Sequence, residues 1–441
     1  MSTFQSLPGF REFYPEDCAA RNNLFRAWRE AARRSGFVEY DAPVLEPLEL
    51  YLEKSGEEIR SQLFEFEDKG GRKVALRPEM TPSLARLVAA RAGSLRRPLK
   101  WFSIGEQFRY EKPQKGRLRS FYQFNADILG EPGPAADAEA IALLVDCLRS
   151  CGLNKGEFEV RVSDRTLWYY LLKEGLNNEN DIPAVLSIID KWERETEEER
   201  GKRLVPYCKN LESLNTKISK LFQLSKEKNT EALSELFALA GDKATEQRLR
   251  EFAVLLDGVN ALGVGDFFRF DPRIVRGLAY YTGFVFEAFQ TVGTARALAG
   301  GGRYDNLIQK LGGPDLPAVG FAIGDVTVSD LLSELKRPLG AIEKPDVYLV
   351  LGEGPAIRQA ALGLVAQLRA AGLAVDYPLK DTGFGKQFKA ADQTGARLAL
   401  ILGADELASG QVKVKNMQSG EETAFPNNAD LPARLREKIV K

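Results

Sequence analysis

Residues 108–130 read F-R-Y-E-K-P-Q-K-G-R-L-R-S-F-Y-Q-F-N-A-D-I-L-G, and this stretch decides the fold. Residues 104–110 and 120–129 are rich in aromatic and branched side chains, which predicts two β-strands. The segment between them contains Pro113 and Gly116, two residue types that favour turns. The sequence therefore predicts a long β-hairpin with an irregular tip.

The predicted hairpin carries a local excess of positive charge. Residues 100–119 hold six Lys or Arg and two Glu, although the whole chain has a net charge of −1. Such a loop suits an anionic ligand, because arginines at the base and tip of a hairpin can grip phosphates through two hydrogen bonds each. The charges alone favour the alternative explanation, a solvated and charged turn.

The pattern F-R-x-E-x-P-x-x-G-R-x-R-x-F-x-Q favours the ligand. It resembles motif 2 of class II aminoacyl-tRNA synthetases, in the form seen in histidyl-tRNA synthetases. The resemblance implies that Arg109 is catalytic and holds the α-phosphate of ATP. It also implies that the tip meets the tRNA acceptor end, with Glu111, Gln114, Arg117 and Arg119 forming this ATP and acceptor loop.

Composition limits the chemistry. The 441 residues suffice for two or three domains, and no run of 18 apolar residues predicts a membrane span. The first residues lack an apolar signal segment, so we expect a cytoplasmic protein.

The chain contains no histidine, which excludes Ser-His-Asp and Cys-His nucleophiles. Its four cysteines predict no zinc site. Nucleotidyl transfer fits this inventory, because positioning and charge neutralisation supply most of its catalysis.

The N-terminal region predicts an irregular lead-in, a helix and an extended segment. Residues 6–13 form the lead-in, and a helix begins at Pro15 and ends near Ser35. Pro43 and Pro47 restrict the extended segment to an edge or an interface. A helix followed by a strand ending in proline resembles class II motif 1, which implies a homodimer.

Residues 77–82 read R-P-E-M-T-P and enter a predicted helix. Thr81 is placed to cap that helix, with Pro82 at its first position. A matching segment in histidyl-tRNA synthetases binds the α-amino group of histidine, which implies binding roles for Glu79 and Thr81. Both explanations of Thr81 stay open.

Residues 271–289 resemble the signature R-G-L-D-Y-Y-T-G-x-V-F-E, with Ala279 in place of the usual Asp. The resemblance implies that Arg276 is catalytic and faces the α-phosphate, and that Tyr280 and Tyr281 line the histidine pocket. The run from residue 280 to residue 289 is predicted to be a strand.

Two hairpin residues complete the implied amino-acid site. Gln123 joins the group around the α-ammonium, and Asp127 reads the imidazole together with Tyr281. Residues 318–332 resemble motif 3, but its usual arginine is Thr327 here. In the absence of that arginine, we expect Arg117, Arg119 and Mg²⁺ to bind the outer phosphates of ATP.

The resemblance spans nearly the whole chain and implies an α+β fold. We expect a class II catalytic domain (1–165 and 264–337) with an antiparallel sheet and flanking helices, a helical insertion (166–263) and a C-terminal α/β anticodon-binding domain (345–441). In the last domain Lys386, Lys389 and Arg397 face either RNA or water.

The implied activity is the ATP-dependent ligation of L-histidine to tRNA(His) through histidyl-adenylate. Two alternatives are paralogues without charging activity: a regulatory subunit of ATP phosphoribosyltransferase in histidine biosynthesis, and a sensor of uncharged tRNA. Such paralogues lose catalytic arginines or the C-terminal domain. The presence of Arg109, Arg276 and a C-terminal α/β segment favours the ligase.

Overall fold

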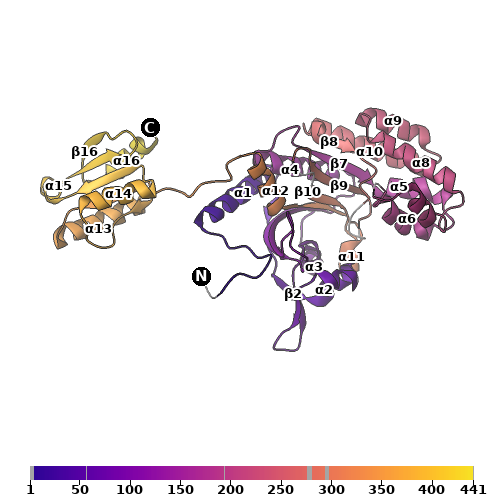
Figure 1. The fold of residues 1–441 in the computed structure, drawn as a ribbon, viewed down its shortest axis with the longest axis horizontal. Coiled ribbons are helices and arrows are strands. Elements are labelled where there is room, and N and C mark those ends of the chain that lie inside the picture. The colour runs from indigo at the N-terminus through magenta and orange to yellow at the C-terminus, as the bar shows by residue number, and fades with distance from the viewer. Residues whose placement is uncertain (1–3, 56, 193, 276–280, 294–296, 441) are drawn as a thin grey trace. The chain divides into compact units, whose positions relative to one another are not determined.

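The computed structural model describes the chain except residues 1–3, 56, 193, 276–280, 294–296 and 441 (Figure 1). The chain divides into two compact units, Met1–Ala341 and Ile342–Lys441. Each unit buries apolar clusters of its own, so each is held together by its own core.

The larger unit is built on an eight-stranded sheet in the order β1-β5-β6-β11-β10-β9-β7-β8. Its strands are β1 (Val38–Glu39), β5 (Leu99–Phe108), β6 (Ser120–Leu129), β7 (Phe158–Asp164), β8 (Phe268–Phe270), β9 (Phe284–Gln290), β10 (Ala297–Arg303) and β11 (Ala318–Gly324). Pairing is antiparallel from β5 through to β7, but the β1–β5 and β7–β8 pairs at the two ends are parallel. The α+β prediction is confirmed, with a mixed sheet in place of the purely antiparallel one.

The predicted hairpin is β5 and β6, which pair from Leu99 with Leu129 to Phe108 with Ser120. Successive side chains of a strand point to opposite faces. The apolar face of β6 enters the core through Phe124, Ala126 and Ile128. The alternate residues Gln123, Asn125 and Asp127 consequently project from the opposite face, where they line a cavity.

Helices cover both faces of this sheet (Figure 1). On the core side lie α1 (Pro15–Arg34), α4 (Pro134–Ser150) and α12 (Asp325–Glu334). On the other side lie α2 (Leu48–Ser55), α3 (Thr81–Arg91), α11 (Leu307–Lys310), the 3₁₀ turn Glu57–Gln62 and a small sheet of β2 (Leu45–Pro47), β4 (Lys73–Leu76) and β3 (Glu65–Glu67). In α1 the predicted acidic first turn is present, with Pro15 opening the helix.

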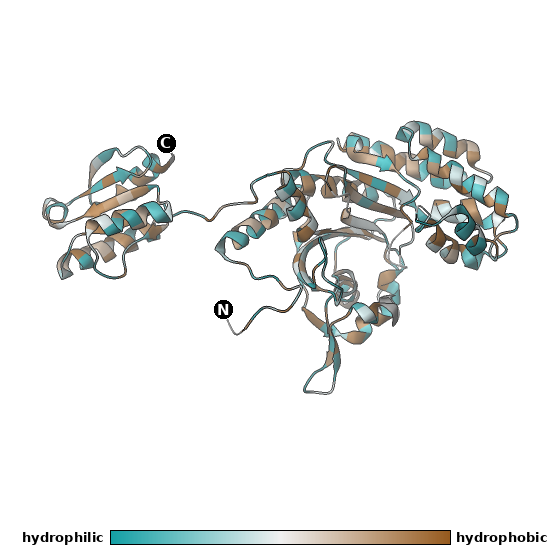
Figure 2. Cartoon of the chain, in the orientation of Figure 1, coloured by the Kyte–Doolittle hydropathy of each residue, from teal (hydrophilic) through white to brown (hydrophobic). Residues whose placement is uncertain are grey.

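A helical insertion joins β7 to β8. Its helices are α5 (Arg165–Leu172), α6 (Ile182–Ile189), α7 (Glu197–Leu204), α8 (Leu211–Leu224), α9 (Asn229–Leu239) and α10 (Lys243–Ala261), with 3₁₀ turns Lys173–Gly175, Glu179–Asp181 and Gly265–Phe267. Figure 2 shows these helices banded in teal and brown, as expected for helices with one buried face. An ion pair of 2.5 Å between Arg248 and Asp164 anchors α10 to the end of β7.

A second buried ion pair links β10 to α4. The guanidinium of Arg303 donates to both carboxylate oxygens of Asp137 at 2.5–3.2 Å, and the two side chains are 4% and 0% exposed. We expect Asp137→Asn to lower the free energy of unfolding by about 3 kcal/mol, because it leaves the buried guanidinium of Arg303 with Asp305, a partly exposed carboxylate 3.2 Å away, as its remaining described countercharge. Chemical denaturation measures the difference in the free energy of unfolding between the variant and the wild type. Glu30→Gln, which breaks the exposed pair with Arg33, is the control and should leave stability unchanged.

The smaller unit has a five-stranded sheet in the order β13-β12-β14-β15-β16. Its elements are β12 (Val347–Leu351), α13 (Pro355–Ala370), β13 (Val375–Asp376), α14 (Phe384–Thr394), β14 (Leu398–Leu402), α15 (Ala404–Ser409), β15 (Gln411–Asn416), β16 (Glu422–Pro426) and α16 (Leu431–Val440). The alternation of strands and helices confirms the α/β fold predicted for this part of the chain. Within the described residues, no helix combines the length and the apolar character needed to cross a membrane.

Candidate active site

Three connected cavities open on the face of the eight-stranded sheet that α3 covers. The sheet cavity, of about 450 Å³, lies over β6, β9, β10 and β11. The loop cavity, of about 260 Å³, lies beneath the hairpin tip. The insertion cavity, of about 580 Å³, extends toward the helical insertion. Glu287 lines all three, so they form one branched cleft.

The sheet cavity gathers five residues predicted to bind the amino acid. They come from three separate parts of the chain and are Glu79, Thr81, Gln123, Asp127 and Tyr281. The other predicted pocket residue, Tyr280, lies outside the described residues, as does the predicted catalytic Arg276. The structure thus brings together the described members of the predicted set.

Asp127 is a buried part of the sheet-cavity lining and lies against Tyr304 and Gly320. Its Oδ1 accepts a hydrogen bond of 2.5 Å from the hydroxyl of Tyr304, and Asp127 is only 4% exposed. Burial, together with the nearby charge of Asp127, raises the pKa of Tyr304 well above its usual value, so the hydroxyl remains a donor. Gly320 faces Asp127 across the β6–β11 pair, and a Cβ atom there would lie 1.9 Å from Oδ1. Glycine at position 320 therefore makes room for the carboxylate.

The R-P-E-M-T segment is fixed by its arginine. Arg77 is buried and donates to the backbone oxygens of Glu106 and Ala42 at 2.9 and 2.7 Å. Arg109 reaches the same segment, with its Nε donating to the oxygen of Pro78 at 3.1 Å. These contacts position Glu79, which follows directly.

The prediction that Thr81 caps the next helix is wrong. The N-cap of α3 is Met80, and Thr81 is the first helical residue, with no capping hydrogen bond from the Met80 side chain. Thr81 therefore presents its side chain from the first turn, where it lines the sheet cavity.

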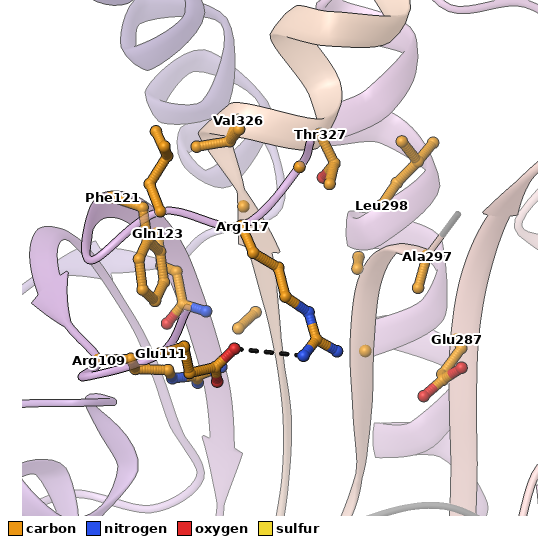
Figure 3. Close-up of a pocket in the computed structure, with 16 residues that line it drawn as sticks. Arg109, Glu111, Arg117, Phe121, Gln123, Glu287, Ala297, Leu298, Val326 and Thr327 are labelled. Carbon is orange, nitrogen blue, oxygen red and sulfur yellow. Dashed lines mark hydrogen bonds and ion pairs between the residues drawn. The ribbon is translucent and has the colours of Figure 1, made fainter. Parts of the chain in front are cut away.

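The loop cavity combines residues of the hairpin with the start of α12 (Figure 3). Arg109 lies over the ring of Phe121, with 5.3 Å from the guanidinium carbon to the ring centre. Arg117 projects into the cavity and pairs with Glu111 at 3.2 Å. Thr327, in the first turn of α12, lies on the far side of Arg117 from Glu111 (Figure 3).

The remaining loop residues lie farther out. Gln114 lines the insertion cavity. Arg119 is absent from the described lining of the three cavities; its guanidinium stacks 4.6 Å from the ring centre of Tyr110 and donates to the Glu111 backbone oxygen at 3.2 Å. At the tip, Lys115 pairs with Glu334 at 2.9 Å, which ties the loop to the end of α12.

The insertion cavity is rich in arginine. Its charged lining comprises Arg117, Arg161, Arg194, Arg273, Asp190, Asp271 and Glu287. Arg273 is neutralised by Asp271 through bonds of 2.8 and 2.7 Å, and Arg161 by Glu159 at 2.7 Å. This arm of the cleft is therefore polar but nearly balanced in charge.

Three polar residues that line the sheet cavity were not predicted from the sequence, namely Asn125, Glu287 and Tyr304. The period-2 alternation of Q-F-N-A-D could have identified Asn125, which shares a face with Gln123 and Asp127. Tyr304 stands directly after the glycine run G-G-G-R, but only the pairing of β10, β11 and β6 brings it to Asp127.

Metal ligands are scarce in the cleft. No group of three or more His, Cys, Asp or Glu side chains with metal-binding geometry occurs among the residues that the structure describes. The cavity carboxylates of Glu111 and Glu287 are nevertheless compatible with Mg²⁺, which proteins commonly hold through one or two carboxylates and the phosphates of a substrate.

Comparison with known proteins identifies the family. The histidyl-tRNA synthetase model matches residues 9–327, and an anticodon binding domain model matches residues 346–436. The histidine–tRNA ligase of Opitutus terrae is 53% identical over 97% of each chain, and that of Natronomonas pharaonis is 41% identical over 98% of each. The crystal structure of histidyl-tRNA synthetase from Nostoc sp. PCC 7120 superposes with a TM-score of 0.81 at 27% identity, covering 99% of this chain and 100% of that one. The chain therefore belongs to the histidyl-tRNA synthetase family and carries both the catalytic and the anticodon-binding domain of these class II histidine–tRNA ligases.

Proposed function

We propose that the branched cleft performs both steps of histidine ligation, with histidine in the sheet cavity and ATP in the loop cavity. The observation that carries this proposal is that the two cavities meet at Arg109, Gln123 and Glu287. The carboxylate of one substrate can thus lie beside the α-phosphate of the other. In this proposal residues 1–165 and 264–337 form the catalytic domain, 166–263 the insertion and 345–441 the anticodon-binding domain.

Open hydrogen-bonding atoms support histidine in the sheet cavity. Gln123 Oε1 and Asn125 Nδ2 are buried, and neither has a partner among the described residues. Buried polar atoms are rarely left unpaired, so a ligand is expected to satisfy them. An acceptor at Gln123 and the carboxylate of Glu79 suit the α-ammonium, with Thr81 beside them.

The imidazole then lies toward Asp127 and Tyr281. Asp127 Oδ1 accepts a hydrogen bond from Tyr304, and because a carboxylate can accept several hydrogen bonds, Asp127 can also accept one from a ring N–H. Tyr281 and, by resemblance, Tyr280 line the same side of the ligand. The shape of this pocket depends on Gly320, because any side chain there displaces the carboxylate.

ATP in the loop cavity is supported by Phe121 and two arginines. Phe121 offers an aromatic face for the adenine. Arg109 lies between this ring and the sheet cavity, which is where a residue that binds the α-phosphate is expected to lie. The family resemblance implies that Arg276 faces Arg109 across the α-phosphate. Arg117, which lines the loop cavity together with Arg109, would bind the outer phosphates, since Thr327 stands at the place of the family's arginine. Mg²⁺ would be held by Glu111 and Glu287 together with those phosphates, and would neutralise part of their charge.

Adenylate formation needs no protein base on this site. The histidine carboxylate is ionised at neutral pH, and it attacks the α-phosphorus as the bond to pyrophosphate breaks. Arg109 stabilises the charge that grows on the phosphoryl oxygens, in a site that fixes both reactants. In the second step a terminal hydroxyl of tRNA attacks the acyl carbon, and AMP leaves.

The proposal also covers where the tRNA and a second subunit bind. The hairpin tip with Gln114 is expected to receive the acceptor end, while the smaller unit binds the anticodon. Val38 and Leu45, from the motif 1 region, are 63% and 41% exposed, which supports a homodimer through this region.

Amino-acid-dependent pyrophosphate exchange, measured with each of the twenty amino acids, tests the function. Exchange with histidine alone is expected, followed by charging of tRNA(His). A folded protein that binds histidine or tRNA without exchange would instead be a paralogue of the regulatory or sensor type. The match to an anticodon binding domain and the 53% identity to a ligase favour the enzyme.

Asp127→Asn should raise the KM for histidine by about tenfold or more and leave the KM for ATP nearly unchanged. The amide keeps the hydrogen bond from Tyr304 but loses the charge-assisted bond to the imidazole, worth roughly 1.5–3 kcal/mol. Steady-state exchange at varied histidine and varied ATP measures both constants. Tyr304→Phe is the control and should cost less, because the carboxylate remains. A rise confined to the KM for ATP would contradict the assignment of Asp127.

A further inference from the structure

Residues 7–13, here called the N-terminal strap, cross the β5–β6 hairpin at the end where its strands enter the tip. The backbone oxygen of Gly9 accepts hydrogen bonds from the amides of Arg119 and Ser120 at 2.9 and 3.2 Å. Gly9 has a φ of +86°, and a Cβ atom there would lie 2.9 Å from Arg119 Cγ. Phe10 packs against Phe108 with ring centres 6.5 Å apart. The segment predicted as an irregular lead-in is thus bound to the catalytic hairpin.

The strap also holds the first residue of α12. Arg11 Nη2 donates to Asp325 Oδ2 at 2.7 Å, and the side chain of Asp325 is only 3% exposed. The other oxygen, Oδ1, accepts from the backbone amide of Tyr122 in β6 at 2.9 Å. Burial raises the pKa of Asp325, and the guanidinium of Arg11 opposes that shift. One carboxylate therefore joins the strap, β6 and α12.

These contacts fall beside the residues that line the loop cavity. Arg119 and Ser120 precede Phe121, Tyr122 precedes Gln123, and Asp325 precedes Val326 and Thr327. The residues of the sheet cavity around Asp127 receive no contact from the strap in the described hydrogen bonds and ion pairs. Among the described contacts, the strap is thus connected mainly to the nucleotide half of the cleft, and it adjoins the amino-acid half beside Gln123, which lines both cavities.

We infer that Arg11 is a positioning residue for the nucleotide, acting through Asp325 on the first turn of α12. This inference rests on the proposed function. It has particular weight in this chain, because Thr327 provides no long cationic side chain that could adjust to the phosphates. The backbone and hydroxyl of that turn must instead be held in place, and the buried Arg11–Asp325 pair holds them.

The test compares Arg11→Met, Arg11→Lys and the double variant Arg11→Met with Asp325→Asn in the full chain. Arg11→Met should raise the KM for ATP about tenfold while the KM for histidine stays within about twofold. Arg11→Lys keeps the charge and should retain most of the ATP affinity. Adding Asp325→Asn removes the uncompensated buried charge and should restore part of what Arg11→Met loses. Arg29→Met breaks an exposed pair with Glu39 and is the matched control, expected to change neither constant.

Two outcomes overturn the inference. One is an equal rise in both KM values, or none, in a folded Arg11→Met protein. The other is a double variant that loses as much ATP affinity as Arg11→Met alone, because removing the second member of an interacting pair should restore part of the loss. If Arg11→Met does not fold, the lysine variant and the double variant decide, because neither leaves a buried carboxylate at position 325 without a countercharge. Calorimetry measures ATP binding to each protein alongside the kinetics. A wild-type protein without histidine-dependent exchange would count against the proposed function. An ATP affinity that is unchanged in Arg11→Met would count against the role of the strap.

Discussion

Arg109→Gln is expected to lower the rate of histidine-dependent pyrophosphate exchange by about 10²–10³-fold, roughly 3–4 kcal/mol of transition-state stabilisation. Arg109 uses its Nε to bind the oxygen of Pro78, while no partner for either terminal Nη is recorded within the described part of the chain. The guanidinium group of Arg109 is therefore fixed through its Nε, and its terminal nitrogens are available to donate to a phosphate. Glutamine keeps a hydrogen-bonding group but removes the charge that the developing phosphoryl oxygens require.

Two further variants make this test specific. Arg91→Gln removes an exposed arginine at the end of α3 and should leave exchange unchanged. Arg109→Lys keeps the charge without the planar fork, and should fall between the wild type and Arg109→Gln. Exchange within about threefold of the wild type in a folded Arg109→Gln protein would show that this arginine does not hold the reacting phosphate.

A chain ending at Ala341 is expected to separate the two half-reactions. All three cavities lie in Met1–Ala341, whose core is independent of the apolar cluster that holds Ile342–Lys441 together. The truncated protein should keep histidine-dependent exchange within about tenfold. Charging of tRNA(His) should fall by about 100-fold or more, near 3 kcal/mol of binding, because one of two contact points with the tRNA is lost.

Folding and subunit assembly of the truncated chain are checked by circular dichroism and sedimentation. A folded truncation that charges tRNA as well as the full chain would assign another role to the smaller unit. A folded truncation without exchange would mean that the smaller unit takes part in adenylate formation.

Local sequence pattern predicted the hairpin because both of its determinants are local. The alternation in residues 120–129 sets which side chains face the core, and the turn residues between the strands set the reversal. The same alternation placed Gln123 and Asp127 on one face. Parts of the site that are near in sequence were therefore predictable from sequence.

Contacts between distant segments were not predictable in this way. Tyr304 reaches Asp127 only because β11 lies between β10 and β6, and strand order is decided by packing of the whole sheet. The short helix α15 and the edge strand β16 lack a strong periodic pattern, so the sequence alone does not predict them. The roles proposed for Glu79 and Arg276 come from the family resemblance, because spacing alone does not indicate them.

The Arg11–Asp325 pair has a consequence for biosynthesis. Its partners are separated by 314 positions, and ribosomes add about 5–20 residues per second, so Arg11 is made roughly 15–60 s before Asp325. The hairpin and the strap can associate early, but the helix that completes the nucleotide half of the cleft emerges only after the whole insertion. A nascent chain therefore cannot hold ATP in a finished site, and adenylate chemistry begins only once about three quarters of the protein has left the ribosome.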